Sequence, residues 1–209
     1  MKIYSIFKSL QGEGLTIGAP TVFIRTSGCP LRCTYCDTPQ AFDKGEQMTL
    51  DDIVKNVAKM KCHHVCLTGG EPLAQKDAPK LIEMLLDEGY HLVLETNGAM
   101  PLDELPCVEN LTISMDIKCP SSGESEKMLF ENIEVLGPTD QLKFIIQDDA
   151  DYEYAKEIVK KYTPKCEVVL TPVGGKDLKG LAEKVLKENL NVRVLPQLHK
   201  FIWGDEDDR

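Results

Sequence analysis

The sequence predicts an α/β protein, an incomplete, open β/α barrel of parallel strands with the active site at the carboxyl ends of the strands. Short apolar strands alternate with amphipathic helices along the 209 residues, and parallel neighbours need such crossover connections. Roughly six or seven strand–helix units are present, fewer than the eight that close a full barrel. A doubly wound sheet is the alternative arrangement, which periodicity alone does not exclude.

The expected elements follow one another in a regular order. Thr49 is a plausible N-cap for the first helix because Asp52 lies three residues on, and Gly89 suits the position just after the second helix. The segment 101–106 lies between prolines and holds at most one helical turn. Strands are expected at 21–26, 65–68, 91–95, 111–114, 141–146, 167–170 and 192–195, and helices at 50–60, 78–88, 126–136, 152–162 and 178–189.

Length and charge limit the possible function classes. The chain suggests one domain over residues 1–209, without a linker or a low-complexity segment. A formal net charge of −10 argues for a small-molecule substrate and against nucleic acid, since polynucleotide binders usually carry a basic excess. We expect no membrane span, and the first residues do not resemble a signal peptide, so a cytoplasmic location is predicted. The acidic segment 204–209 is expected to be solvated.

Three of the eight cysteines are crowded into eight residues, Cys29, Cys33 and Cys36, in a C-x3-C-x2-C pattern. Iron–sulfur cubanes are usually held by four thiolates. Three cysteines would leave one iron free to bind the amino and carboxylate groups of S-adenosylmethionine. The alternative is a zinc site, with a fourth ligand from Cys62, His63 or His64. Cys66 lies inside an apolar strand and is expected in the core.

Other unusual residues also follow predicted strands. In a parallel sheet the carboxyl ends of the strands lie together, so motifs that are far apart in sequence converge there. The converging residues are Gly69-Gly70-Glu71-Pro72 after the second strand, Glu95-Thr96-Asn97-Gly98 after the third, Ser114, Asp116 and Lys118 at the fourth, Thr171 after the sixth, and Gln197 and His199 after the last.

Two resemblances follow from these motifs. The cysteine triad with an aromatic residue, Tyr35, before its last cysteine resembles the radical S-adenosylmethionine superfamily, and Gly69-Gly70-Glu71 is similar to its glycine-rich motif. Over residues 6–199 the chain more closely resembles the 7-carboxy-7-deazaguanine synthases. That resemblance rests on the strings LQGEG at 10–14, FIR at 23–25, CDT at 36–38, LTGGEPL at 67–73, LETNG at 94–98 and QLHK at 197–200.

The resemblance implies a lyase that converts 6-carboxy-5,6,7,8-tetrahydropterin into 7-carboxy-7-deazaguanine, with ring contraction and loss of ammonia, for queuosine or archaeosine synthesis. The radical comes from the cofactor, so no protein side chain is assigned as catalytic. The implied cofactors are one 4Fe–4S cluster on Cys29, Cys33 and Cys36, S-adenosylmethionine, and Mg²⁺ at Thr38. The implied partners are the pterin, an electron donor such as flavodoxin or ferredoxin, and a second copy of the chain in a homodimer.

The resemblance also implies two sets of binding residues. Arg25 would bind the substrate carboxylate, for which a planar guanidinium is well shaped. Two alternatives stay open, a glycyl-radical activase of the same superfamily and a zinc-binding module. The substrate set is Leu10, Gln11, Gly12, Glu13, Arg25, Thr68 and His199, and the S-adenosylmethionine set is Tyr35, Cys36, Asp37, Gly70, Glu71, Asn97, Ser114, Asp116, Lys118 and Thr171.

Overall fold

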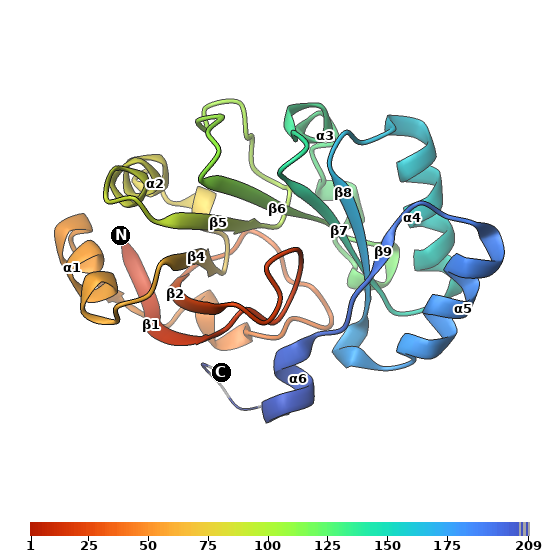
Figure 1. The fold of residues 1–209 in the computed structure, drawn as a ribbon, viewed down its shortest axis with the longest axis horizontal. Coiled ribbons are helices and arrows are strands. Elements are labelled where there is room, and N and C mark those ends of the chain that lie inside the picture. The colour runs from red at the N-terminus through yellow and green to blue at the C-terminus, as the bar shows by residue number, and fades with distance from the viewer. Residues whose placement is uncertain (205, 207, 209) are drawn as a thin grey trace.

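In the computed structural model, which describes residues 1–204, 206 and 208, the strands form a nine-stranded sheet of order β3-β1-β2-β4-β5-β6-β7-β8-β9. The helices lie around the outside of the curved sheet (Figure 1). The strands are β1 (Lys2–Leu10), β2 (Pro20–Thr26), β3 (Glu46–Gln47), β4 (His64–Gly69), β5 (His91–Thr96), β6 (Leu111–Ile117), β7 (Gln141–Ile146), β8 (Glu167–Pro172) and β9 (Arg193–Val194). The helices are α1 (Leu50–Lys59), α2 (Ala78–Asp87), α3 (Asn132–Val135), α4 (Asp149–Tyr162), α5 (Leu178–Glu188) and α6 (Leu198–Trp203).

Strand order distinguishes the two arrangements left open by the sequence. From β2 to β9 the strands of the parallel section stand side by side in chain order, and every pair is parallel. A doubly wound sheet reverses its strand order at a switch point, and this sheet does not. The prediction of an incomplete, open β/α barrel is therefore confirmed. None of the helices in the described part of the chain is long and apolar enough to cross a bilayer.

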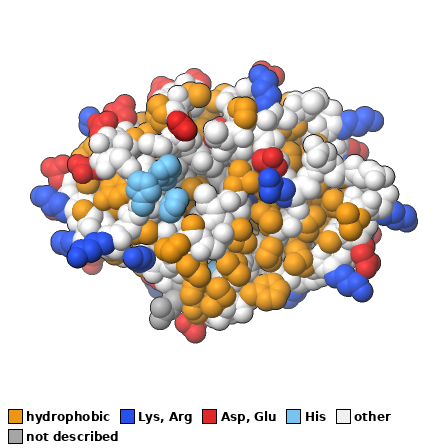
Figure 2. Space-filling model, viewed as in Figure 1, with side chains coloured by type: hydrophobic (Ala, Val, Ile, Leu, Met, Phe, Trp, Pro, Cys, Tyr) orange, Lys and Arg blue, Asp and Glu red, His pale blue; other side chains and the backbone are white. Residues whose placement is uncertain are grey.

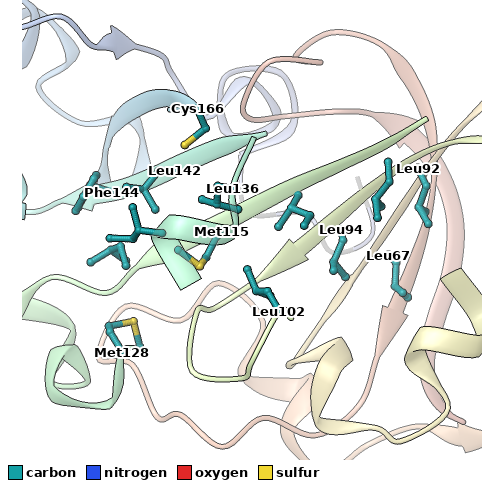
Figure 3. Close-up of a cluster of buried hydrophobic side chains, with 14 of the residues drawn as sticks. Leu67, Leu92, Leu94, Leu102, Met115, Met128, Leu136, Leu142, Phe144 and Cys166 are labelled. Atoms are coloured by element: carbon teal, nitrogen blue, oxygen red, sulfur yellow. The ribbon is translucent and has the colours of Figure 1, made fainter. Parts of the chain in front are cut away.

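The main core lies between the sheet and its helices. Leu67, Leu94, Met115 and Phe144 come from four successive parallel strands and are all fully buried (Figure 3). A smaller apolar cluster on other strand positions contains Phe23, Cys66 and Val93, with Phe7 packed against it. Cys66 is thus a core residue, as the sequence predicted.

Most helix ends follow from local sequence. The hydroxyl of Thr49 accepts a hydrogen bond from the amide of Asp52 at 3.2 Å, so the predicted N-cap of α1 is confirmed. Gly89 follows α2 with φ of +81°, a left-handed conformation that glycine adopts without strain.

The predicted helix at 126–136 is wrong. Only a 3₁₀ turn at Ser125–Lys127 and the short helix α3 form there. Met128 between them is extended, and its sulfur accepts a hydrogen bond from the amide of Lys118 at 3.3 Å. The Asn132 side chain accepts from the Leu102 amide and donates to the carbonyl of Met100. These tertiary contacts outweigh the local helix propensity.

The strands β1 and β3 and the helix α6 were not predicted. β1 lies antiparallel to β2, with Leu10 opposite Pro20, so the segment that follows it lies at the amino end of the parallel strands. α6 forms directly after β9, and its first amide, that of Leu198, donates to the carbonyl of Gly12 at 2.8 Å. A segment near the N-terminus and a segment near the C-terminus therefore contact each other here (Figure 1).

Candidate active site

A cavity of about 300 Å³ is lined by the inward-facing side chains of the parallel strands. Alternate residues of a strand face the same side of a sheet. Arg25 on β2 lies in register with Thr68 on β4, and Asp116 on β6 with Lys143 on β7. Glu95 on β5 lines the cavity between these two pairs. Parallel strands therefore bring five polar side chains, distant in sequence, to one place.

The cysteine loop follows β2 at the carboxyl end of the sheet. Cys29, Cys33 and Cys36 all line the cavity and are partly buried. The Sγ of Cys29 accepts hydrogen bonds from the Leu31 amide and from Nδ2 of Asn97, both at 3.4 Å. Such donors to sulfur are typical of iron–sulfur sites. Three thiols on one loop, each able to bind a different iron, fit a cluster with one iron open to a ligand.

The other proposed zinc ligands lie elsewhere. His63 and His64 come at the amino end of β4, and their rings lie 4.5–5.8 Å from each other and from that of His91. Histidines gather on the surface of the face shown in Figure 2. The cysteine loop leaves the opposite end of the parallel strands, roughly 20 Å away for a six-residue strand. Cys62 lies at the same end as the histidines, where its thiol donates to the carbonyl of Pro20. A zinc site that joins the triad to Cys62, His63 or His64 is therefore excluded by distance.

Gly69 and Gly70 allow close backbone approach beside the cysteine loop. A Cβ on Gly70 would lie 2.1 Å from the carbonyl oxygen of Gly28 and 3.2 Å from Cβ of Cys29. Gly69 has φ of +136°, and a Cβ there would clash with Thr26. Glycine at both positions therefore lets this loop pack main chain against main chain beside the cysteine loop, where both residues line the cavity.

Glu71 points away from the cavity. Its carboxylate is fully buried and accepts hydrogen bonds from the amide of Leu73, the hydroxyl of Thr96 and the amide of Asn97, at 2.7–3.0 Å. Burial raises the pKa of this carboxyl to about 7, although the donors partly oppose the rise. Glu71 thus joins the glycine loop to the end of β5 and orients Asn97 toward the cluster loop.

Asp116 offers a buried acceptor to the cavity. Its Oδ2 forms an ion pair with Nζ of Lys118 at 2.6 Å, whereas its Oδ1 is buried, lies 3.4 Å from Nζ of Lys143 and accepts no hydrogen bond. A buried acceptor without a hydrogen bond is costly unless a ligand satisfies it. Asp116 therefore fits the role of an acceptor for a cofactor hydroxyl or amine.

The loop after β1 closes the cavity from the amino end of the strands. Gln11 and Glu13 line the cavity, and Oε1 of Glu13 accepts from Nε2 of Gln197 at 2.8 Å. A Cβ on Gly12 would lie 2.1 Å from Nδ1 of His199, so this position requires glycine. Burial lowers the pKa of His199, although Glu13 opposes the change. The loop and α6 together form the floor of the cavity.

Lys143 is a site residue that was not identified from the sequence. Its side chain is 2% exposed, and its Nζ lies 2.6 Å from Glu95, 2.9 Å from Glu13 and 3.4 Å from Asp116. Burial lowers the pKa of Lys143, but the three carboxylates raise it well above its ordinary value. The only sequence signal was a lysine inside the otherwise apolar stretch Leu142–Ile146.

The guanidinium of Arg25 faces an acidic residue of the chain's end. Nε of Arg25 lies 3.6 Å from Oδ1 of Asp208, which also accepts a hydrogen bond from the hydroxyl of Ser5 at 2.9 Å. Asp208 lines the cavity, so the expectation of a fully solvated acidic end is wrong at this residue. Asp205, Asp207 and Arg209, which shared that expectation, lie outside the described residues.

Thr38 lines the cavity two residues after Cys36. It precedes a 3₁₀ turn at Pro39–Phe42, but its hydroxyl forms no capping hydrogen bond. Thr38 therefore does not cap this turn through its side chain. Its hydroxyl remains available to a ligand in the cavity.

The structure brings most of the predicted residues together. Ser114, whose hydroxyl accepts from Gln141, does not line the cavity, and neither does Thr171 nor Glu71, although all three are buried nearby in the sheet or its loops. The predicted residues that do line it are Leu10, Gln11, Gly12, Glu13, Arg25, Cys29, Cys33, Tyr35, Cys36, Asp37, Thr38, Thr68, Gly70, Asn97, Asp116, Lys118 and His199.

Comparison with known proteins gives consistent results. The model of the Radical SAM superfamily matches residues 23–179, a stretch that begins after the loop at Gln11–Glu13 and ends before α6. The chain is 45% identical to 7-carboxy-7-deazaguanine synthase of Methanospirillum hungatei, over 97% of this chain and 85% of that one. It is 38% identical to the enzyme of the same name from Thermoplasma acidophilum, over 98% of both chains.

A solved structure shares the fold. The crystal structure of QueE from Escherichia coli superposes with a TM-score of 0.78, covering 95% of this chain and 94% of the other, at 24% sequence identity. The open barrel described above is therefore a fold already known in another protein.

Proposed function

This chain belongs to the 7-carboxy-7-deazaguanine synthases of the radical S-adenosylmethionine superfamily, and we propose that its cavity binds 6-carboxy-5,6,7,8-tetrahydropterin beside the cofactors. It is a radical S-adenosylmethionine enzyme of deazapurine biosynthesis, a lyase that forms 7-carboxy-7-deazaguanine. The observation that carries the proposal is one cavity with the cysteine triad at its carboxyl end and Glu13, Arg25 and His199 around the remaining space.

The cofactor end of the cavity is formed by the cysteine loop and its neighbours. Cys29, Cys33 and Cys36 would hold the 4Fe–4S cluster. Gly70 would bind S-adenosylmethionine by backbone contact, and Asp116 through its Oδ1, which accepts no hydrogen bond. When bound, these cofactors supply the radical that removes hydrogen from C6 of the pterin. The wider set of Tyr35, Asp37, Asn97 and Lys118 would line the same ligand, with Glu71, Ser114 and Thr171 behind it.

The substrate end is formed by the loop after β1, by Arg25 and Thr68, and by α6. A tetrahydropterin carries adjacent N–H donors on its cyclic guanidine, which match the carboxylate of Glu13. Arg25 would hold the substrate carboxylate with two parallel hydrogen bonds. His199 packs on Gly12 and would fix the ring from the side of α6. Leu10, Gln11 and Thr68 complete this end.

We also propose that Thr38 binds Mg²⁺ together with oxygens of the substrate. Its hydroxyl lies in the cavity without a capping partner. Mg²⁺ prefers six oxygen ligands and is often completed by substrate and water. One neutral hydroxyl is a weak site by itself, so binding of the ion would depend on the pterin carboxylate.

Further parts of the proposal concern partners and organisation. We propose a flavodoxin- or ferredoxin-like electron donor, a homodimer, a cytoplasmic location and a single domain over residues 1–209. The donor follows from the need for one electron to reduce the cluster. The glycyl-radical activase and the zinc module are not favoured, because the named relatives match nearly the full chain and the zinc ligands are too far apart.

The deciding experiment is anaerobic turnover. Purified protein is incubated with carboxytetrahydropterin, S-adenosylmethionine, Mg²⁺ and dithionite, and products are identified by mass. We expect 7-carboxy-7-deazaguanine and ammonia without any partner protein. Reductive cleavage of S-adenosylmethionine with the pterin left intact would contradict the proposed substrate while retaining the radical chemistry.

A further inference from the structure

We propose that Lys143 is a positioning residue that links the two ends of the cavity, holding Glu13 as an ionised acceptor for the pterin and sharing its charge with Asp116 on the cofactor side. The inference rests on the proposed function for the identity of the ligand. It adds a residue and a role that the motifs of the sequence did not contain.

The geometry shows one ammonium group among three carboxylates from different elements. Nζ of Lys143 on β7 lies 2.9 Å from Oε2 of Glu13 in the loop after β1 and 2.6 Å from Oε2 of Glu95 on β5. The Oδ1 of Asp116 on β6 lies 3.4 Å from the same nitrogen. The lysine side chain is 2% exposed, so water contributes little to these interactions.

The position of Lys143 makes it hard to replace by the neighbouring lysine. Lys118 lies 2.6 Å from the other oxygen of Asp116, and within the described part of the chain it forms no ion pair with Glu13 or Glu95. Removal of Lys143 would therefore leave Glu13 and Glu95 close together, buried and without a cation. A buried charge that loses its partner is strongly unfavourable, so one carboxylate would take up a proton or turn away.

The charged groups that face Glu13 come from each packed element. They are Lys143 from β7, Glu95 from β5 and His199 from α6, whereas Asp116 from β6 faces Lys143 and Glu95. Burial raises the pKa of Glu13, but Lys143 and the hydrogen bonds from Gln197 and Lys143 lower it to about 2. Glu13 is therefore ionised at every pH at which the enzyme is handled.

Without Lys143 the balance at Glu13 reverses. Burial, which raises the pKa, is the largest influence, and only Gln197 and His199 would remain to lower it. The Glu13 carboxyl would then titrate above its ordinary value, within the range where binding can be measured. Protonated Glu13 cannot accept two hydrogen bonds from the pterin, so pterin affinity would fall as the pH is lowered.

The experiment measures pterin binding to cluster-loaded enzyme without reductant, so that no turnover occurs. Carboxytetrahydropterin is titrated calorimetrically under anaerobic conditions with saturating S-adenosylmethionine, from pH 5 to pH 8. For Lys143→Met we expect affinity at pH 6 at least about tenfold below wild type. The deficit should grow toward pH 5, and Lys143→Arg, which retains the charge, should remove the growth of that deficit.

Two further variants serve as controls for Lys143→Met. Lys156→Met removes a lysine that pairs with Glu153 and Glu188 outside the cavity, and its pterin binding should equal that of wild type. Lys118→Met should weaken S-adenosylmethionine binding more than pterin binding, because Lys118 pairs with Asp116 and not with Glu13. If Lys143→Met does not load its cluster, the double variant with Glu95→Gln removes one carboxylate as well and supplies the pH profile.

The outcomes separate the two proposals. Failure of the wild-type enzyme to bind the pterin would overturn the proposed function and this inference with it. Pterin binding by wild type, with a Lys143→Met affinity within twofold at all pH values, would overturn the role of Lys143 alone. A loss that is the same at every pH would also overturn it, since a purely structural effect has no reason to follow the ionisation of Glu13.

Discussion

The Nε of Arg25 lies 3.6 Å from Oδ1 of Asp208, so a carboxylate of the chain's end stands at the guanidinium that is proposed to bind the substrate carboxylate. Asp208 has a side chain 32% exposed, against 15% for Arg25. An ion pair at this distance between two partly exposed side chains contributes about 0–1 kcal/mol. It can therefore be displaced by a substrate that brings further contacts.

Asp208→Asn should lower the KM for the pterin by roughly twofold to fivefold. The reason is that the asparagine carries no charge and no longer competes with the substrate carboxylate for Arg25. The measurement is initial rate against pterin concentration, with Glu134→Gln on the exposed side of α3 as the control for loss of one negative charge. A higher KM in Asp208→Asn would show instead that the residue helps to hold Arg25 or the substrate.

Arg25→Lys should weaken pterin binding while S-adenosylmethionine binding stays intact. The change keeps the charge but loses two-pronged hydrogen bonding, which should cost about 1.5–3 kcal/mol. It also removes the guanidinium stacked 5.4 Å from the ring of Phe7. The measurement is the equilibrium affinity of wild type and Arg25→Lys for the pterin and for S-adenosylmethionine. Equal pterin affinity in the two proteins would show that Arg25 has only a structural role.

Cys29→Ala, Cys33→Ala and Cys36→Ala should each abolish turnover and remove most of the iron, since each thiolate binds a different iron. Cys107→Ala and Cys166→Ala should retain iron near the wild-type level, because neither lines the cavity. Iron per polypeptide after anaerobic reconstitution measures this. Similar iron loss in both groups of variants would be incompatible with the triad as the cluster site.

Thr38→Ala should lose most of the stimulation by Mg²⁺ while keeping its cluster. The reason is that the Thr38 hydroxyl lines the cavity without a capping hydrogen bond and would give a metal one oxygen ligand beside the substrate carboxylate. Rate is measured against Mg²⁺ concentration after chelator treatment, with Thr34→Ala as a control in the same loop, whose hydroxyl bonds the Ser121 carbonyl. Equal stimulation of wild type and Thr38→Ala by Mg²⁺ would show that Thr38 does not bind the metal.

Glu71 should make the folded protein less stable as the pH rises from about 4.5 to about 7. Burial raises its folded pKa from 4.5 to about 7, so in this window the unfolded chain ionises while the folded carboxyl keeps its proton. The loss is complete above about pH 7 and absent below about pH 4.5. Thermal unfolding without S-adenosylmethionine should show a smaller fall in Tm over this window for Glu71→Gln than for wild type, and parallel curves would refute the shift.

Local signals were enough for much of the fold. β7 matches its predicted bounds because QLKFII has a clear strand pattern. Thr49 at the start of α1 and Gly89 after the end of α2 were predicted because capping depends on contacts within a few residues. The segment 126–136 failed because its outcome depends on Lys118 and on residues near Met100, which no local pattern contains.

The site was predictable where a motif lies on one loop and less so where it depends on packing. The cysteine triad and Gly70 were found because they follow parallel strands, and Asp116 because it lies near the carboxyl end of one. Lys143 was not, because a lysine in an apolar strand gives no indication of which acids will surround it. The direction of the Glu71 carboxylate, toward Thr96, likewise depends on how two loops pack.

The contact between Gly12 and α6 has a consequence for how substrate choice can change. The stretch common to the superfamily, residues 23–179, carries the cluster loop, whereas Gly12 and Leu198 lie on either side of it and bond each other. If the pterin binds as proposed, part of the selectivity therefore comes from two short flanking segments that contact each other. A graft intended to give this scaffold a new substrate should exchange both together, because either alone would meet an unmatched neighbour and leave the radical machinery without a floor.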